Sequence, residues 1–290
     1  MKRMWIIGIL WLFATNAQAE SQSSVFKVCA KHDCFYLAGT VHILPHQAYP
    51  LPSVFEQAYQ ASSVLLFEAE IPADDDVQAQ QAMLSTMRYQ DGSTLSSRLS
   101  PAVRQQLVLA LRRYDLPLAP FEQYHAGFIA TQLTLLEAKR VGLDDIGVDS
   151  YFEKKAKVDH KPRRYLETLD FQLQLIKNLG DGREAEFIEA ALVELAQTEA
   201  SLKEIIQAWR RGSLDDIEQA VLNPTQSQDP TSYELLFVKR NQQWLPKLQQ
   251  LFGNQDTELV LVGAGHLAGP QGLVHLLKAK GYQVTQLEHQ

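Results

Sequence analysis

The sequence contains little cysteine and no dense cluster of basic residues. There are two cysteines among 290 residues, and the formal net charge is -7. A surface that binds nucleic acid normally gathers many Lys and Arg side chains, so this composition argues against a nucleic-acid partner. The length is sufficient for a globular protein with a large apolar core.

Long apolar runs are absent after the first residues. Met1–Arg3 is basic, Met4–Ala14 is apolar, and Asn16–Ala19 ends in a small-x-small pattern. This order predicts a signal peptide over residues 1–19, cleaved after Ala19, and a mature chain that is periplasmic or secreted. The apolar stretch is short for a membrane span, although an uncleaved anchor is the alternative. No span is expected after cleavage.

Two common catalytic motifs are also missing. The sequence has no G-x-S-x-G, which contains the nucleophile of many serine hydrolases, and no H-E-x-x-H, the zinc-binding motif of zincins. Neither class of hydrolase is therefore supported. Any hydrolytic chemistry has to come from another arrangement of side chains.

Cys29 and Cys34 lie on either side of Ala30–Asp33, a short segment that is typical of a hairpin turn. In an oxidising compartment the two thiols would form a disulfide across this turn. The alternative is a metal-binding pair completed by His32, but no fourth ligand is nearby in the sequence. We expect the disulfide.

Apolar runs rich in β-branched and aromatic residues predict a sheet built from both ends of the chain. The expected strands are Val25–Val28, Phe35–Ala38, Val64–Glu68, Leu259–Val262 and Tyr282–Leu287, with a short one at Arg163–Leu166. The fold class expected is α/β (α+β), with a central mixed sheet in a single domain over residues 20–290.

Between these strands the apolar spacing is helical, which predicts a large helical insertion over about 78–222. The expected helices are Ser53–Gln60, Ala102–Tyr114, Phe121–Val141, Val148–Lys157, Asp170–Leu179, Arg183–Thr198, Leu202–Arg211 and Tyr233–Phe252. Ser100 before Pro101 is a standard start signal. We expect the last helix to be interrupted near Pro246, and Asn223–Asp229 to be a polar loop.

Two histidines follow two of the predicted strands with the same spacing. Gly39 precedes His42 by three residues, and Gly263 precedes His266 by three residues, with Gly265 between. If the two strands are neighbours, both imidazoles lie at the same edge of the sheet, where open α/β sheets bind ligands. Glu68 ends a third apolar strand in the same way.

Two histidines and a glutamate allow two kinds of chemistry. His42, Glu68 and His266 would suit a divalent metal such as Mn²⁺, Co²⁺ or Zn²⁺, which would acidify a bound water or polarise a carbonyl. Without a metal, one histidine would act as a general base and the other would donate to an oxyanion. The residues alone leave both possibilities open.

The glycines near His266 permit another interpretation. Gly263, Gly265 and Gly269 resemble a dinucleotide-binding loop, with Glu288 near the position of its ribose-binding acid. Against this, His266 occupies the tight turn, and the chain ends soon after Glu288. We therefore favour paired histidines over a dinucleotide site.

Several other polar residues have two interpretations each. Arg240 would hold a carboxylate or stabilise an oxyanion, or it would form a surface ion pair. Glu167 would be a site residue or only an acid at a helix start. The acidic run Asp74–Asp76 is most simply a solvated loop, with weak Ca²⁺ binding as the alternative.

The order and spacing of short segments along nearly all of the mature chain resemble the TraB/GumN family, which is similar to the Tiki metalloproteases. The segments are Leu37–His42, Leu66–Glu68, Gly147–Phe152, Leu166–Thr168 with Gln172, Trp209 with Gly212, Lys239–Asn241, Val262–Leu267 and Gly281–Tyr282. The paired G-x-x-H motifs are the most specific part of this resemblance.

The resemblance implies a divergent α/β fold shared with erythromycin-esterase-like proteins, with both G-x-x-H loops at the active cleft. It implies His42, Glu68, Arg240 and His266 as the site residues and Glu167 as a substrate-binding candidate. Tiki relatives are described as Mn²⁺- or Co²⁺-dependent proteases of secreted peptides. Bacterial members are mostly uncharacterised, and some are linked to pheromone shutdown or polysaccharide gene clusters, so membership does not define the activity.

The leading hypothesis is a periplasmic metal-dependent hydrolase acting on a peptide. His42 and His266 would bind the metal, Glu68 would be a ligand or general base, and Arg240 would stabilise the substrate or the tetrahedral intermediate. The alternatives are a protein that binds a peptide or small molecule without turnover, and hydrolysis without a metal.

Overall fold

The computed structural model describes residues 23–70, 72, 76–143 and 145–288. The predicted signal peptide lies outside the described residues, as do Asp74 and Asp75 of the acidic run. No helix in the described ranges is long and apolar enough to cross a membrane.

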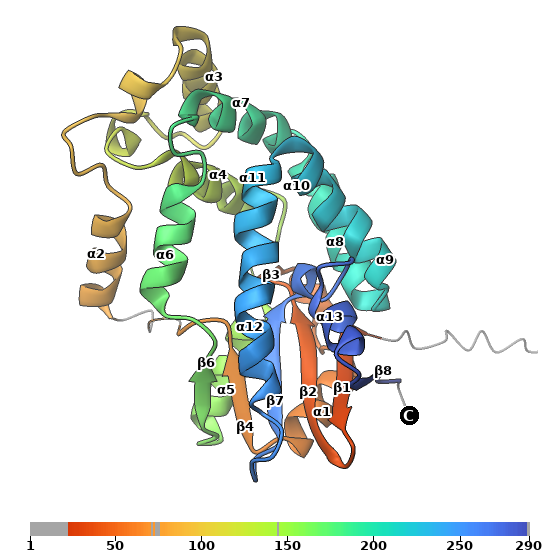
Figure 1. Cartoon of the computed structure of the whole chain (residues 1–290). Helices are drawn as coiled ribbons and strands as arrows, with labels where there is room; N and C mark the ends of the chain where they lie inside the picture. Colours follow the sequence, from red (N-terminus) through yellow and green to blue (C-terminus); the bar gives the residue numbers. More distant parts are fainter. Residues whose placement is uncertain (1–22, 71, 73–75, 144, 289–290) are drawn as a thin grey trace, which may run out of the picture.

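A mixed sheet forms the centre of the molecule (Figure 1). Its strands are β1 (Val25–Ala30), β2 (Asp33–Thr40), β4 (Val64–Phe67), β6 (Arg163–Tyr165), β7 (Glu258–Gly263) and β8 (Gln283–Gln286). Their order is β6-β4-β7-β2-β1-β8; the first four run parallel, and β1 is antiparallel to both of its neighbours. The expected α/β sheet, assembled from both ends of the chain, is confirmed.

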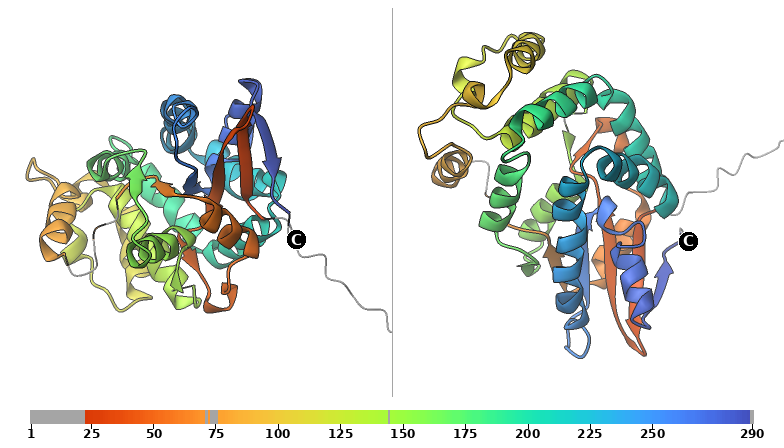
Figure 2. Two further views of the ribbon diagram at one scale, coloured as in Figure 1. Left: turned by 90° about the horizontal axis from the view of Figure 1, so that it is seen from below. Right: turned by 45° about the horizontal axis from the view of Figure 1, so that its top comes forward.

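The helices cover both faces of the sheet and one end of it (Figures 1 and 2). They are α1 (Ser53–Ala61), α2 (Val77–Thr86), α3 (Pro101–Arg112), α4 (Ala126–Arg140), α5 (Val148–Val158), α6 (Leu169–Asn178), α7 (Glu184–Leu195), α8 (Thr198–Arg211), α9 (Leu214–Ile217), α10 (Asn223–Gln228), α11 (Pro230–Tyr233), α12 (Lys239–Gln249) and α13 (Leu273–Ala279). Shorter helical turns are η1 (His46–Ala48), η2 (Leu95–Arg98), η3 (Ala119–Phe121), η4 (Glu218–Leu222), η5 (Glu234–Val238) and η6 (Ala264–His266).

Strand β7 shows how the sheet is buried on both faces. Leu259 and Leu261 belong to a core with residues of α1, α5 and α8. Val260 and Val262 face the other way, into a core with residues of α12 and α13. All four side chains are buried, which explains why this strand is a continuous apolar run rather than an alternating one.

The middle of the chain has a separate hydrophobic core that includes residues of α3, α4, α6 and α7. These helices lie at one end of the sheet (Figure 1). The segment is not wholly helical, because it includes β6, which pairs with β4 in the sheet. Helix α5, just before β6, packs in the core on one face of the sheet. A two-stranded ladder between β3 (Ile43–Leu44) and β5 (Asp145–Ile146) also links the segment to the loop after β2.

Cys29 and Cys34 are paired across the β1–β2 hairpin and form a disulfide. This confirms the predicted bridge. It also rules out the alternative of a metal-binding pair completed by His32, because both thiols are consumed.

Two local predictions were wrong. Asn223–Asp229 is not a polar loop, since Asn223–Gln228 forms α10: Pro224 lies in its first turn, where no backbone N–H is needed, and the Asp229 side chain caps α11. Pro246 does not interrupt α12. Trp244 and Leu248 on either side of it are fully buried, and we attribute the continuity to that packing.

Candidate functional site

The two G-x-x-H motifs leave the same edge of the sheet side by side. Strands β2 and β7 are parallel neighbours, and Thr40 is opposite Gly263 in their register. Strand β4 pairs with the other side of β7, so Glu68, directly after it, reaches the same edge. The parallel sheet therefore brings together the three groups that the sequence predicted as a site.

These groups converge on one small space beside Gly263. A methyl group at Gly263 would lie 3.4 Å from Glu68 Oε1, 3.7 Å from His266 Cδ2 and 3.9 Å from His42 Nε2. The backbone φ of Gly263 is -50°, so glycine is not required here for a left-handed turn. The absence of a side chain at Gly263 instead leaves space at the centre of the site.

His42 lies at the open side of the site and is paired with Asp149. Its Nδ1 is 3.1 Å from Asp149 Oδ1, and 65% of its side chain is exposed. The carboxylate accepts a hydrogen bond from Nδ1–H, so in the neutral form of His42 the unprotonated nitrogen is Nε2. Asp149 raises the pKa of His42 above 6.5 and outweighs the opposing desolvation. Water screens an exposed pair and moderates this rise.

Asp149 reaches His42 because α5 begins very close to the backbone of the first motif. The Val148 N–H donates to Val41 O, and a Cβ on Gly147 would lie 2.3 Å from the carbonyl oxygen of His42. Only glycine permits this approach without a shift of the backbone. Asp149 follows in the first turn of α5.

His266 is buried and fixed from both sides. Its Nδ1 is 2.7 Å from Asn241 Oδ1, an atom that only accepts, so Nδ1 has the proton. Nε2 then accepts from Arg240 Nη1 at 3.0 Å. Burial lowers the pKa of His266 to about 3, and the charges of Arg240 and His42 act in the same direction. His266 is therefore a neutral acceptor.

Arg240 is the buried cation of the site. Its Nη2 donates to Glu68 Oε2 at 2.6 Å and to Glu167 Oε2 at 2.9 Å. The guanidinium also lies 4.5 Å above the ring of Trp244. Arg240 is 6% exposed, which excludes the surface ion pair considered from the sequence. Burial lowers the pKa of Arg240, but Glu68 and Glu167 raise it by more.

Glu167 lies behind Arg240 rather than in the open cleft. Its side chain is 4% exposed. One carboxylate oxygen accepts from Trp244 Nε1 at 2.9 Å, and both accept from Arg240. No oxygen is left for a substrate, so this geometry assigns Glu167 to holding Arg240 in place.

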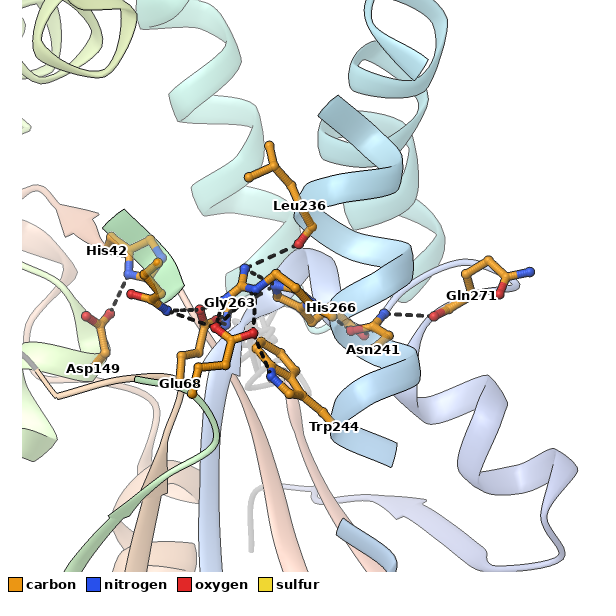
Figure 3. Close-up of polar contacts among 12 residues, drawn as sticks. His42, Glu68, Asp149, Leu236, Asn241, Trp244, Gly263, His266 and Gln271 are labelled. Carbon is orange, nitrogen blue, oxygen red and sulfur yellow. Dashed lines mark hydrogen bonds and ion pairs between the residues drawn. The ribbon is translucent and has the colours of Figure 1, made fainter. Parts of the chain in front are cut away.

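Glu68 connects the buried and open halves of the site. Its Oε1 accepts the Gly263 N–H at 2.6 Å, and its Oε2 accepts from Arg240 and from Gln172 Nε2 at 3.2 Å. Burial would raise the pKa of Glu68, but the charges of Arg240 and His42 and the hydrogen bond from Gly263 N–H favour the carboxylate more strongly and lower the pKa to about 2. Glu68 is therefore ionised. Figure 3 shows His42 and Asp149 on one side of it and His266 and Asn241 on the other.

The three predicted metal ligands do not form a ligand set in this geometry. His42 Nε2 and Glu68 Oε1 face the space at Gly263. The lone pair of His266 Nε2 is instead occupied by Arg240, and this nitrogen is 3.9 Å from Glu68 Oε1. Within the described ranges, no group of three or more His, Cys, Asp or Glu side chains is arranged to hold a metal ion.

Sequence reasoning did not assign functions to four residues that complete the site: Asp149, Gln172, Asn241 and Trp244. They come from α5, α6 and α12, in segments far from either G-x-x-H motif. The available signal was weak. Asp149 begins a helix after a glycine, and Asn241 and Trp244 are close to Arg240 in the sequence.

The dinucleotide interpretation of the glycine run is wrong. The Gly263 N–H is bonded to Glu68, only the short turn η6 (Ala264–His266) follows Gly263, and α13 begins at Leu273, so the glycine run does not lead directly into an α-helix. Glu288 follows β8, which is separated from β7 by β2 and β1. A ribose-binding acid would have to lie on the adjacent strand.

Two cavities meet at the exposed side of the site. The larger has a volume of about 350 Å³ and extends from His42, Glu68 and His266 toward α8 and η5. The smaller, about 220 Å³, extends from His42 and Glu68 toward Asp149 and Gln172. Both open beside His42, so a molecule in either one reaches the same reactive groups.

Comparison with known proteins identifies the family. An uncharacterized protein of Escherichia coli (strain K12), YbaP, is 26% identical over 245 residues, which is 84% of this chain and 88% of YbaP. The protein of the same name from Shigella flexneri is 25% identical over 244 residues, 84% of this chain and 87% of its own length. No solved structure gave a match. The sequence profile of the TraB/PrgY/gumN family matches residues 24–286, and the chain therefore belongs to this family.

Proposed function

We propose that this protein is an exported hydrolase that cleaves a peptide bond with His42 as its general base. The observation that carries the proposal is the His42–Asp149 pair, which leaves Nε2 free beside Glu68 at the junction of two cavities. Above its raised pKa, His42 is a neutral imidazole whose other nitrogen is held by a carboxylate, and this is a standard arrangement for a general base. Export is supported by the predicted signal peptide and by the Cys29–Cys34 disulfide.

The geometry supports a direct attack by water. A water molecule in the space at Gly263 would lie within reach of both His42 Nε2 and Glu68 Oε1. His42 would remove its proton as the oxygen bonds to the substrate carbonyl carbon. The same proton would then pass from His42 to the leaving nitrogen as the C–N bond breaks.

Arg240 would contribute charge rather than a free hydrogen bond. Its donors are engaged by Glu68, Glu167, Leu236 O and His266, so its position does not depend on a substrate. A fixed cation near the reacting carbonyl stabilises negative charge that develops there. His266 and Glu167 would hold this cation and would not contact the reacting atoms.

The test is cleavage of a library of internally quenched peptides by the full chain, expressed with its own N-terminal segment. We expect the wild type to cleave a subset and His42→Gln to be inactive while remaining folded. Cleavage by both proteins at equal rates would contradict the proposal. Binding of peptides by both without cleavage would instead support the alternative of a binding protein.

Metal-dependent hydrolysis is a second candidate, because His42 Nε2 and Glu68 Oε1 face the same small space. A divalent ion there, such as Mn²⁺, Co²⁺ or Zn²⁺, would have these two residues as ligands and would supply an acidified water. Dialysis against EDTA tests this candidate. Loss of cleavage that Mn²⁺ restores would assign the reaction to a metal, and full retention would assign it to the His42–Asp149 pair alone.

A further inference from the structure

A buried threonine whose hydroxyl has no hydrogen-bond partner lines both cavities of the site. Thr40 is 3% exposed, and its Oγ1 has no hydrogen-bond partner. Thr40 lines both cavities, two residues before His42. Buried hydroxyl groups are almost always bonded, so an unbonded one on a residue that lines an open site is a candidate for a partner supplied by a ligand.

In the described ranges, two other buried hydroxyl groups also lack a partner, Ser23 Oγ and Tyr89 OH. Thr40 differs from both in its position beside the site. Neither Ser23 nor Tyr89 lines either cavity of the site. Ser23 is fully buried near Gly212 and Gln286, away from His42. It therefore provides a matched comparison, because it has the same chemical group without the cleft.

The walls of the larger cavity indicate what kind of side chain it accepts. The reactive groups lie at one end, and the remaining wall is mainly apolar. The apolar wall is formed by Val41, Ile43, Leu202, Ile205, Val221, Leu236 and Phe237. At about 350 Å³, the cavity has room for one bulky aliphatic or aromatic side chain.

The smaller cavity differs in its polar groups. Besides Phe67 and Leu261, it is lined by Asp149 and Gln172. A main chain crossing from one cavity to the other has to pass Thr40 and His42, which line both. The carbonyl oxygens of such a chain are the natural partners of an unpaired hydroxyl.

We propose that Thr40 contacts the substrate directly, by donating a hydrogen bond to a main-chain carbonyl of a peptide that spans both cavities and places a bulky apolar side chain in the larger one. This rests on the proposed function. It adds the substrate class, an extended peptide with an apolar residue beside the cleaved bond, and a residue that recognises it.

The experiment compares Thr40→Val, which removes the hydroxyl with little change of shape, with Thr40→Ser, which retains it. Ser23→Ala is the control for a buried hydroxyl outside the cleft. Quenched peptides carry Leu, Phe, Ser or Asp at one varied position. The kcat/KM of each variant is measured for each peptide. The Kd of dye-labelled peptides is measured separately, on versions of the same variants that also carry His42→Gln to prevent cleavage.

We expect Thr40→Val to keep or raise the Tm and to lower kcat/KM about tenfold, the loss expected for one hydrogen bond. Thr40→Ser should recover most of this loss, and Ser23→Ala should leave kcat/KM unchanged. Leu and Phe peptides should be preferred over Asp peptides by tenfold or more. Ile205→Trp, which fills part of the larger cavity, should reduce that preference.

The outcomes separate this inference from the proposed function. Unchanged kcat/KM and Kd in Thr40→Val would overturn the role of Thr40 while leaving the hydrolase intact. Binding that weakens in Thr40→Val without any cleavage by the wild type would support Thr40 and contradict the hydrolase. Equal kcat/KM for Leu and Asp peptides would overturn the apolar specificity.

Discussion

His42 and His266 have the same place in their motifs and opposite environments. His42 is exposed and paired with a carboxylate, whereas His266 is 3% exposed and lies between an amide and a guanidinium. The pKa of His42 is raised and that of His266 is lowered to about 3. Two motifs with the same G-x-x-H spacing on adjacent strands therefore place two histidines that differ in pKa, exposure and hydrogen-bond partners.

The difference originates in the helices that pack against each motif. Helix α5 contributes Asp149 to His42, and α12 contributes Arg240 and Asn241 to His266. A carboxylate polarises an imidazole for proton transfer, whereas a buried guanidinium disfavours a second positive charge beside it and so favours the neutral form of His266. We infer that His42 reacts and that His266 supports Arg240.

We expect the largest effect on activity from the replacement of His42. If it is the general base, His42→Gln should lower kcat about 10²- to 10⁴-fold. The free energy of unfolding should change by less than about 0.5 kcal/mol, because the side chain is exposed. Peptide cleavage and urea unfolding measure the two effects, and the exposed His275 on α13 is the control. A similar loss of activity in His275→Gln would contradict this assignment.

Removal of Arg240 should have a large effect on stability as well as on activity. Arg240→Gln leaves Glu68 and Glu167 buried without their cation, so we expect a loss of about 3–5 kcal/mol in the free energy of unfolding. Arg211→Gln breaks an exposed ion pair with Asp216 and should cost less than about 1 kcal/mol. Equal losses in the two variants would show that the buried network does not stabilise the fold.

The two histidines should affect stability with opposite dependence on pH. The folded-state pKa of His266 is depressed, so its contribution is present above pH 6.5 and is lost as the pH falls toward 3, with a slope of up to about 1.4 kcal/mol per pH unit. The pKa of His42 is raised, so its smaller contribution is present below pH 6.5 and is lost at higher pH.

Urea unfolding of the wild type and of His266→Gln between pH 4 and 8 measures the first effect. The variant should show a smaller loss of stability between pH 6.5 and 4 than the wild type. Glu68 also titrates at low pH, since its pKa is lowered from 4.5 to about 2, but its contribution is lost mainly below pH 4.5. Identical pH dependence in the two proteins would show that His266 is not held in its neutral form.

The smallest expected effect is that of Asp149→Asn, which removes the charge beside His42 and keeps its shape. The pKa of His42 should fall toward 6.5, so the acidic limb of the pH–activity profile should move to lower pH. We expect kcat to fall roughly tenfold, since a charge-assisted hydrogen bond is replaced by a neutral one. Asp215→Asn, which changes an acid on the short helix α9, is the control. An acidic limb at the same pH in Asp149→Asn and the wild type would show that Asp149 does not raise the pKa of His42.

Local sequence determined the strands and the convergence of the site. The apolar runs of β4 and β7 and the turn between Cys29 and Cys34 are short-range patterns, and the structure has them where they were expected. The G-x-x-H spacing placed His42 and His266 after two strands. Because parallel neighbours end at one edge, the two histidines were expected to meet if these strands were adjacent, and β2 and β7 are adjacent in the sheet.

Only the tertiary structure decided what each histidine contacts. Asp149 and Asn241 are 107 and 25 residues away in the chain from their histidines, and no local pattern pairs them. The same holds for Pro246, which stays helical because its neighbours Trp244 and Leu248 are buried against the sheet. The spacing of residues in the sequence predicts which side chains reach the edge of the sheet. Which lone pair remains free there depends on the side chains that distant helices bring to it, and that is a property of the packed fold.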